Sequence, residues 1–443
     1  MPTEDQLLRL EEGLVGARVI SDPDLYRVEL ERIFARSWLF VAHESEIPNP
    51  GDFVTRWMGE DPVIVSRAQD GSLHVMLNVC RHRGRKVCTE DAGNSSHFRC
   101  GYHGWTYSAA GELTGVPFLD AYQGKLDRAS LGLCQAGRVD SYQGLIFATW
   151  DEHAQPLREF LGDIAWVLDV LFGRTAGMQV VGPPMRWTVD ANWKLGATNF
   201  TGDAYHLPTT HGYGAALGMD VTRGRRAGYT LSTENAHAAN INRWPEGNMG
   251  KPYLSLPEHL RAELESRLTP DQLEVMRSMV SFAGNVFPNF SYLNIATVGF
   301  LNTEWRSADT PAAPDDSKAT SFLTIRQWQP KGVDKMEIWS WQLMDRDVPD
   351  WWRESSIACY TRSFGMAGMH EQDDIENWSA ISEGCRGPMG RAQWLNYQMR
   401  LGEKQAPADW PGPGEADYLY PMSVSDRNER AFYHHWQELM ERP

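Results

Sequence analysis

The feature that most constrains this chain is a pair of short segments that each carry one cysteine and one histidine. Cys80 and His82 lie in NVCRHRG, and Cys100 and His103 lie in FRCGYHGW. Both pairs follow strand-like residues and precede glycine-containing loops, so a compact β module can bring the four side chains around one inorganic centre. Because the chain has only 6 Cys in 443 residues, paired cysteines are better interpreted as metal ligands than as disulfides.

Two kinds of metal centre use mixed Cys and His ligands. Zinc sites commonly place like residues together, as Cys-x-x-Cys and His-x-x-x-His. A Rieske 2Fe-2S cluster binds one iron through two Cys and the other through two His. Each pair here combines one Cys with one His, which favours the Rieske cluster over zinc. Neutral imidazole ligands raise the potential to about −150 to +300 mV, against about −400 mV for plant-type clusters. Such a cluster can accept an electron from a ferredoxin and pass it on.

The pattern of the residues changes along the chain. From about Trp38 to Asp151, short β-like runs such as DPVIVSRA and LHVMLNVC alternate with turn residues, which predicts a small all-β module. Helical runs follow, mixed with strand-like runs over residues 321–329 and 336–346 that predict an antiparallel hairpin. The predicted fold class is α+β: the small module plus a larger domain with a central antiparallel β-sheet flanked by helices.

A second constellation lies in NWKLGATNFTGDAYHLPTTHG. Asn199, Asp203 and His206 are spaced so that a helix would place them on one face. We expect Pro208 to end that helix, because the residue before a proline avoids the α region. His211 would then turn back beside His206. Such a pair is more often ordinary surface or core histidine, but with a distant carboxylate it makes the facial triad of non-haem Fe(II) oxygenases.

The best source of that carboxylate is the segment FGMAGMHEQDDIENW. It contains Glu371, Asp373, Asp374 and Glu376. The ordinary interpretation of such a cluster is a solvated, acidic start of a helix. Apolar residues on both sides indicate partial burial instead, where an unpaired carboxylate is costly. A nearby cation would remove that cost.

Charge and hydropathy exclude two classes of partner. The formal net charge of −16 disfavours nucleic-acid binding. No apolar stretch approaches the ~20 residues that span a bilayer, and MPTEDQLLRLEEG lacks the basic start and apolar run of a signal peptide. We therefore expect a cytoplasmic protein that binds neither nucleic acid nor membrane.

With both constellations in view, the chain resembles the α (large, catalytic) subunits of Rieske non-haem iron ring-hydroxylating dioxygenases, most closely the naphthalene and polycyclic-aromatic branch. NVCRHRG, FRCGYHGW, NWK…NFTGDAYH…H and EQDDIENW occur in the family's order. The resemblance covers essentially the whole chain and implies three parts. These are an N-terminal helical segment over residues 1–38 that packs on the catalytic domain, a Rieske 2Fe-2S domain over 39–155, and a catalytic mononuclear iron domain over 156–443.

The resemblance assigns a role to each residue of the second constellation. It implies that His206, His211 and Asp374 hold a mononuclear Fe(II), with Asp373 as the alternative carboxylate. Asn199 matches a position close to the iron that is usually not a strong ligand.

The resemblance also implies a link between the two centres. Asp203 matches an aspartate that, in the family, hydrogen-bonds a cluster-ligating histidine of a neighbouring subunit and an iron-ligating histidine of its own subunit. In this sequence, Asp203 would join His103 of one chain to His206 of the next. A carboxylate in this place also orients a metal-bound imidazole.

Four positions match the family's substrate pocket: Phe200, Ala204, Phe364 and His370. Phe200 and Phe364 suit an apolar aromatic ring. His370 stands where many relatives carry a bulky apolar or aromatic residue. It is therefore a candidate contact for a polar substrate group, such as a carboxylate or hydroxyl. The alternative is a packed histidine that is satisfied by a backbone carbonyl.

The activity that the resemblance implies is cis-dihydroxylation of an aromatic ring with both atoms of dioxygen. Electrons would come from NADH through a ferredoxin reductase and a ferredoxin to the Rieske cluster, and through Asp203 to the mononuclear Fe(II). The expected assembly has three α with three β subunits. One alternative is a Rieske monooxygenase or demethylase of an aromatic substrate. A pure electron-transfer Rieske protein is the other, although most of this chain lies beyond the Rieske module.

Overall fold

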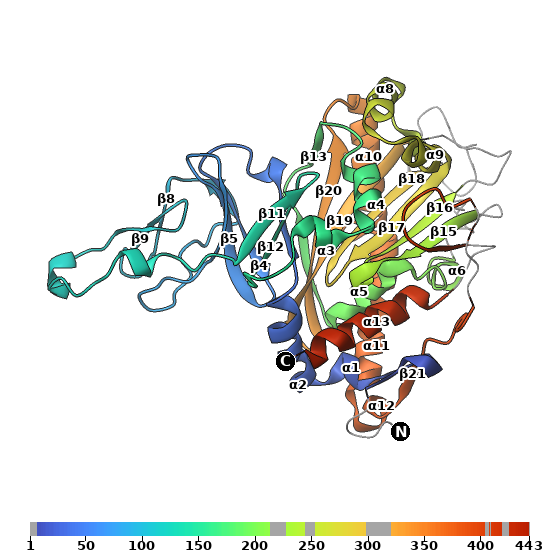
Figure 1. Cartoon of the computed structure of the whole chain (residues 1–443), viewed down its shortest axis with the longest axis horizontal. Coiled ribbons are helices and arrows are strands. Elements are labelled where there is room, and N and C mark those ends of the chain that lie inside the picture. The colour runs from blue at the N-terminus through green and yellow to red at the C-terminus, as the bar shows by residue number, and fades with distance from the viewer. Residues whose placement is uncertain are drawn as a thin grey trace. The chain divides into compact units, whose positions relative to one another are not determined.

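The computed structural model describes residues 7–212, 227–243, 253–297, 320–403, 407, 409–418 and 425–442. The chain forms two compact units (Figure 1). The smaller unit is Val28–Phe160, and the larger one combines Met1–Arg27 with Leu161–Pro443. Within the described ranges, no helix has both the length and the apolar character that a membrane span requires.

The smaller unit is built almost entirely of antiparallel strands. They form a four-stranded sheet in the order β6-β5-β4-β7 and two three-stranded sheets, β10-β9-β8 and β11-β12-β3. This arrangement confirms the predicted all-β module. The strands are β3 (Leu39–His43), β4 (Asp52–Met58), β5 (Asp61–Arg67), β6 (Leu73–Leu77), β7 (Ala92–Asn94), β8 (His97–Arg99), β9 (Thr106–Ser108), β10 (Leu113–Gly115), β11 (Arg138–Tyr142) and β12 (Leu145–Thr149). The short helices are η2 (Leu30–Phe34), η3 (Glu44–Glu46), η4 (Leu119–Tyr122) and η5 (Ala129–Leu131).

The chain passes from one unit to the other within two helices, α2 (Pro23–Glu29) and α3 (Leu157–Leu161). In the larger unit the strands are β1 (Leu8–Arg9), β2 (Leu14–Gly16), β13 (Met178–Val180), β14 (Met185–Val189), β15 (Ala227–Ser232), β16 (Ala238–Arg243), β17 (Met279–Val286), β18 (Phe290–Thr297), β19 (Thr320–Gly332), β20 (Lys335–Asp345), β21 (Trp394–Asn396) and β22 (Ala416–Tyr418).

The helices of the larger unit are α1 (Arg18–Ser21), α4 (Ile164–Phe172), α5 (Trp193–Gly202), α6 (Leu207–Thr210), α8 (Glu258–Arg267), α9 (Pro270–Ser278), α10 (Asp350–Ser363), α11 (Met369–Arg386), α12 (Pro388–Arg391) and α13 (Arg427–Glu441). Short turns of helix are η1 (Leu10–Glu12), η6 (Glu234–Ala236) and η7 (Tyr253–Ser255).

A nine-stranded antiparallel sheet forms the centre of the larger unit (Figure 1). Its order is β13-β20-β19-β18-β17-β16-β15-β22, with β14 also pairing with β20. The predicted hairpin is confirmed as β19 and β20, which pair from Leu323 with Leu343 to Gly332 with Lys335. A separate small sheet joins β1, β2 and β21. The predicted α+β class, with a central antiparallel sheet and flanking helices, is therefore correct.

Helices cover both faces of this sheet, which explains why its long strands are buried almost throughout. Arg326 of β19 faces α5, because its guanidinium lies 5.5 Å from the Phe200 ring. Tyr292 of β18 is paired with Ile325, the neighbour of Arg326, and therefore faces the opposite way. Its ring meets the edge of Phe172 in α4. The helix α10 packs on β19 and β20.

Candidate metal centres

Two loops of the smaller unit carry the Cys and His pairs, and equivalent hydrogen bonds close both. In each loop the cysteine N–H donates to the carbonyl five residues ahead, at 2.9 Å for Cys80 and 2.8 Å for Cys100. The N–H four residues ahead returns to the cysteine carbonyl, from Gly84 at 2.9 Å and from Gly104 at 3.0 Å. These glycines have φ of +76° and +75°, which only glycine adopts at little cost. The repeated loop explains why each pair mixes a cysteine with a histidine.

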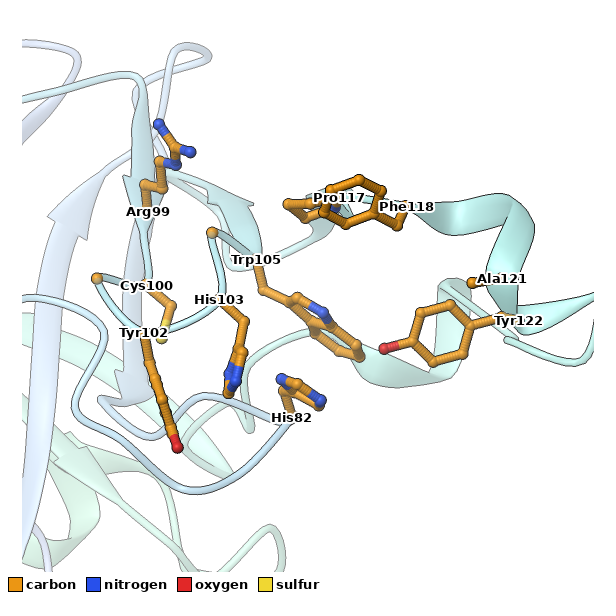
Figure 2. A pocket seen from close by; sticks show the side chains of 12 residues that line it. His82, Arg99, Cys100, Tyr102, His103, Trp105, Pro117, Phe118, Ala121 and Tyr122 are labelled. Atoms are coloured by element: carbon orange, nitrogen blue, oxygen red, sulfur yellow. The ribbon is translucent and has the colours of Figure 1, made fainter.

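The two loops place the two cysteines next to each other and the two histidines next to each other. Cys80 and Cys100 are 3% and 2% exposed, and their side chains contact each other. The rings of His82 and His103 lie 4.5 Å apart (Figure 2). His82 Nδ1 is buried without a hydrogen-bond partner among the described residues. Two cysteines together and two histidines together fit a binuclear cluster better than a single zinc ion.

Hydrogen bonds to sulfur favour thiolate ligands at this centre. Burial alone would raise the pKa of the Cys100 thiol, but hydrogen bonds from the Tyr102 backbone N–H and from the Cys80 side chain lower it. The Tyr107 hydroxyl lies 3.3 Å from Cys80 Sγ and accepts the Arg81 N–H at 3.0 Å. A Cys80 thiolate carries no proton, so in that state the Tyr107 hydroxyl is the donor to the sulfur.

The histidine side of the group opens into a pocket of about 780 Å³ (Figure 2). The Trp105 indole is stacked on His82, with ring centres 5.0 Å apart and planes inclined by 6°. The rim is apolar and exposed, since Tyr102 and Phe118 are 59% and 88% exposed. The rings of His82 and His103 can therefore reach a partner molecule, whereas the sulfurs cannot.

In the larger unit, His206, His211 and Asp374 form a group whose possible ligand atoms all lie within 4.8 Å of one another. Among the described residues it is the one group of this kind. Asp374 Oδ1 lies 3.5 Å from His206 Nε2 and 3.3 Å from His211 Nε2. The donor set, two imidazoles and one carboxylate, is that of non-haem Fe(II) oxygenases.

Besides Asp374, each of the two histidine rings contacts one further carboxylate, which lies at its Nδ1 atom. His206 Nδ1 lies 3.3 Å from Asp203 Oδ2, and His211 Nδ1 is hydrogen-bonded to Asp373 Oδ2 at 3.2 Å. Both rings therefore direct Nε2 toward Asp374. Burial alone would lower the pKa of His206, but contact with the Asp203 carboxylate raises it above its usual value.

The expectation that Asn199, Asp203 and His206 share one helix was wrong. The helix α5 ends at Gly202, whose φ of +135° lies outside the helical region. Asp203 follows in an extended conformation, and its N–H donates to the Asn199 carbonyl at 3.2 Å as the last helical bond. Asn199 and Ala204 are half-buried on either side of this helix end.

Pro208 also acts differently from the prediction. It lies in the first turn of α6, where its missing N–H leaves no helical bond unmade, and so it starts a short helix instead of ending a long one. Between the helices, Asp203 Oδ1 accepts hydrogen bonds from the N–H groups of Tyr205 at 2.9 Å and His206 at 3.2 Å. The turn that this carboxylate stabilises, and not a helix face, brings His206 beside His211.

The acidic segment begins α11. Glu371 and Asp374 are buried, Asp373 is partly exposed and Glu376 is exposed. The interpretation of this cluster as a solvated helix start is therefore correct for Glu376 but not for the buried Glu371 and Asp374. The two adjacent aspartates point to different nitrogens: Asp374 to both Nε2 atoms, and Asp373 to Nδ1 of His211.

Two of the predicted pocket residues flank one arginine, and a third, His370, stacks on one of them. The guanidinium carbon of Arg326 lies 5.5 Å from the ring centres of both Phe200 and Phe364. His370 stacks on Phe364 at 5.3 Å and meets the His211 ring edge-on at 4.8 Å. Burial, together with the nearby His211, lowers the pKa of His370 to about 4, so its ring is neutral at neutral pH.

Sequence reasoning missed the buried ion pair behind this cluster. Arg326 Nη1 lies 2.7 Å from Glu371 Oε2, and neither side chain is exposed. Arg326 also donates to the Phe364 carbonyl at 2.5 Å. Burial raises the pKa of Glu371, whereas the Arg326 guanidinium in direct contact with it lowers the pKa and stabilises the carboxylate. A lone arginine in the apolar strand SFLTIRQWQ was the available signal, since a buried charge needs a partner.

Fold and site together define an iron oxygenase with a Rieske centre, and comparison with known proteins agrees. The family model of the Rieske [2Fe-2S] domain matches residues 37–142, which rules out the zinc alternative. The biphenyl dioxygenase subunit alpha of Paraburkholderia xenovorans (strain LB400) is 36% identical over 459 residues, covering 99% of this chain and 93% of the relative. The N,N-dimethyl phenylurea N-demethylase subunit alpha of Sphingobium sp. (strain YBL2) is 35% identical, covering 96% and 91%.

Among solved structures, naphthalene 1,2-dioxygenase from Rhodococcus sp. bound to indole superposes with a TM-score of 0.88 at 43% identity, covering 97% of this chain and 95% of that one. The chain therefore belongs to the Rieske non-haem iron ring-hydroxylating dioxygenases, as a large (α) subunit. It is an oxidoreductase whose cofactors are the 2Fe-2S cluster and a mononuclear iron, with dioxygen as co-substrate, and it works with partner proteins. A pure electron-transfer protein is excluded.

Proposed function

We propose that this chain inserts both atoms of dioxygen into an aromatic ring to give a cis-dihydrodiol. The observation that carries the proposal is the group His206, His211 and Asp374 beside the phenylalanine rings around Arg326. When bound, the cluster supplies electrons and the mononuclear iron activates dioxygen. The biphenyl and naphthalene relatives support an aromatic hydrocarbon as substrate.

The residues of the chain position the reactants. Phe200 and Phe364 provide flat apolar walls that suit an aromatic ring and exclude water. The neutral His370 offers a polar edge next to Phe364, which would suit a substrate with a hydroxyl or carboxylate. Because Glu371 compensates Arg326, the arginine supports this wall without presenting a free charge to the substrate.

Electrons are proposed to reach the iron from a second copy of the chain, through Asp203. One oxygen of Asp203 is held by backbone N–H groups, yet its side chain remains 34% exposed. It can therefore accept a further hydrogen bond from His103 of a neighbouring chain. Exposed aromatic residues flank both partners, Tyr102 beside the cluster and Tyr205 beside Asp203, as a docking surface requires.

The wider assembly that we propose follows the family. Three α subunits would associate with three β subunits, and a ferredoxin with its NADH-dependent reductase would supply electrons. A cytoplasmic location fits the six cysteines, none of which forms a disulfide, because disulfides are rare in reducing compartments.

Product analysis with isotopically labelled dioxygen tests the reaction. Purified oxygenase, supplied with a ferredoxin, its reductase and NADH, would be given biphenyl or naphthalene under labelled dioxygen. The proposal predicts a cis-dihydrodiol that carries two labels. A hydroxylated product with one label, from every substrate that is turned over, would contradict it.

N-demethylation is the second candidate, because the phenylurea demethylase matches 96% of this chain. The same two metal centres would then insert one oxygen atom into an N-methyl group, which leaves as formaldehyde. Incubation with an N,N-dimethyl phenylurea separates the candidates. Formaldehyde release without any dihydrodiol from aromatic hydrocarbons would favour the demethylase.

A further inference from the structure

We infer that Asp373 is a positioning residue that holds His211 through Nδ1, and not a ligand of the iron. The inference rests on the proposed iron site of His206, His211 and Asp374. It gives each histidine of that site its own supporting carboxylate, Asp203 for His206 and Asp373 for His211.

The directions of the two imidazole nitrogens carry the argument. In His211, Nδ1 contacts Asp373 Oδ2 at 3.2 Å, while Nε2 contacts Asp374 Oδ1 at 3.3 Å. In His206, Nδ1 and Nε2 contact Asp203 and Asp374 in the same way, at 3.3 Å and 3.5 Å. The nitrogens of one ring point in divergent directions, so an oxygen bound to Nδ1 cannot share an ion that sits on Nε2.

The helix explains why adjacent aspartates take different roles. Successive residues of α11 are rotated by about 100° around the helix axis. Asp374 is therefore directed inward, with its side chain 4% exposed, while Asp373 lies at the edge, 31% exposed. One residue reaches the centre of the group, and its neighbour reaches the outer nitrogen of the same histidine.

The hydrogen bond to Asp373 selects the tautomer that a metal needs. A neutral histidine carries one N–H, and when Asp373 accepts it from Nδ1, the lone pair of Nε2 is left for the iron. The carboxylate also restrains ring rotation and makes the imidazole more basic. Loss of such a partner typically weakens metal binding by about 10- to 100-fold.

The test is the Fe(II) affinity of the full-length protein with its 2Fe-2S cluster intact, measured anaerobically by competition with a chromophoric chelator. Asp373→Ala should weaken Fe(II) binding by about 10- to 100-fold. Asp373→Asn keeps a neutral acceptor of the same shape and should lose less. The visible cluster spectrum and the thermal midpoint should stay those of the wild type, which a merely structural role would not predict.

Glu376→Gln is the matched control, because it removes one exposed carboxylate from the same helix. It should bind Fe(II) like the wild type, and Asp374→Asn should bind almost none. Wild-type affinity in Asp373→Ala would overturn the inference. Loss of iron in Asp373→Asn as complete as in Asp374→Asn would also overturn it, since Asp373 would then be the ligand. If the wild type with an intact cluster bound no Fe(II), the proposed function itself would fail.

Discussion

The two metal centres are built in opposite ways. The four Rieske ligands lie in two equivalent loops of one small β unit, and hydrogen bonds within each loop fix them. The mononuclear group instead joins the two ends of α6, His206 and His211, to the first turns of α11, an element far away in the sequence. The first site is therefore specified by local structure, while the second depends on how helices pack on the sheet. Each centre should therefore lose its metal independently of the other when the residues that hold it are replaced.

The largest expected effect comes from removing the shared carboxylate. Asp374→Asn should lower the iron content from about three to about two per chain. Product formation should fall by roughly three orders of magnitude or more, with the cluster spectrum unchanged. Metal analysis and labelled-product assays check this. If the cluster disappeared together with the mononuclear iron, the two centres would not be independent.

The next largest effect is expected on the stability of the larger unit, through the buried ion pair of Arg326 and Glu371. Arg326→Met leaves Glu371 buried without its cation, which should destabilise the larger unit by about 3–5 kcal/mol. A double variant, Arg326→Met with Glu371→Met, should recover much of this loss. Denaturant unfolding followed by far-UV circular dichroism measures the stability, and visible absorbance shows whether the cluster persists. An Arg326→Met protein as stable as the wild type would contradict the role of the ion pair.

A smaller effect is expected at the cluster. Tyr107→Phe removes the hydroxyl that is directed at Cys80 Sγ. Less stabilisation of the reduced, more negative cluster should lower its potential by roughly 20–60 mV, the equivalent of one hydrogen bond. Spectroelectrochemical titration measures the change. Tyr122→Phe is the control, because this hydroxyl points toward Trp105 (Figure 2). Equal shifts in both variants would argue against a specific bond to sulfur.

The smallest effect is on the pH dependence of the β unit. Burial lowers the pKa of His43 below 6.5, although Glu46 opposes the shift, and its Nδ1 accepts the Ser45 N–H at 3.1 Å. Below pH 6.5 the unfolded chain binds a proton that the folded chain does not. The stability from His43 is therefore present above pH 6.5 and is lost as the pH falls through the folded pKa.

Thermal bleaching of the cluster at pH 7.5 and 5.5 checks this prediction. The wild type should bleach at a lower temperature at pH 5.5. His43→Asn, which keeps a residue that can cap the turn, should reduce the difference. A variant with the same pH dependence as the wild type would show that other groups control the stability of this unit.

The difference between the centres also explains what the sequence could predict. The mixed Cys and His pairs indicated a binuclear cluster, because the repeated loop is a local structure. His206 and His211 were found as a pair, but the helix expected to join Asn199 to His206 ends at Gly202.

Long-range packing decided the features that the sequence did not predict. The resemblance assigned Asp374 to the iron, and the structure places it beside both histidines. The separate contact of Asp373 with His211 follows from how α11 is rotated against His211, and no spacing rule specifies that rotation. The sequence likewise does not indicate that Glu371 is the partner of Arg326, because Glu371 lies in a helix and Arg326 in the central sheet, and only their packing brings them together.

The most direct test of the account is the count of iron and acid-labile sulfide in the purified protein, together with its visible spectrum. Two separate centres predict about three irons and about two sulfides per chain, with the absorption of a Rieske cluster. A protein that reached about two irons and two sulfides, and took up no third iron under anaerobic Fe(II), would contradict the site on His206, His211 and Asp374. A colourless protein that stayed free of iron would contradict both centres.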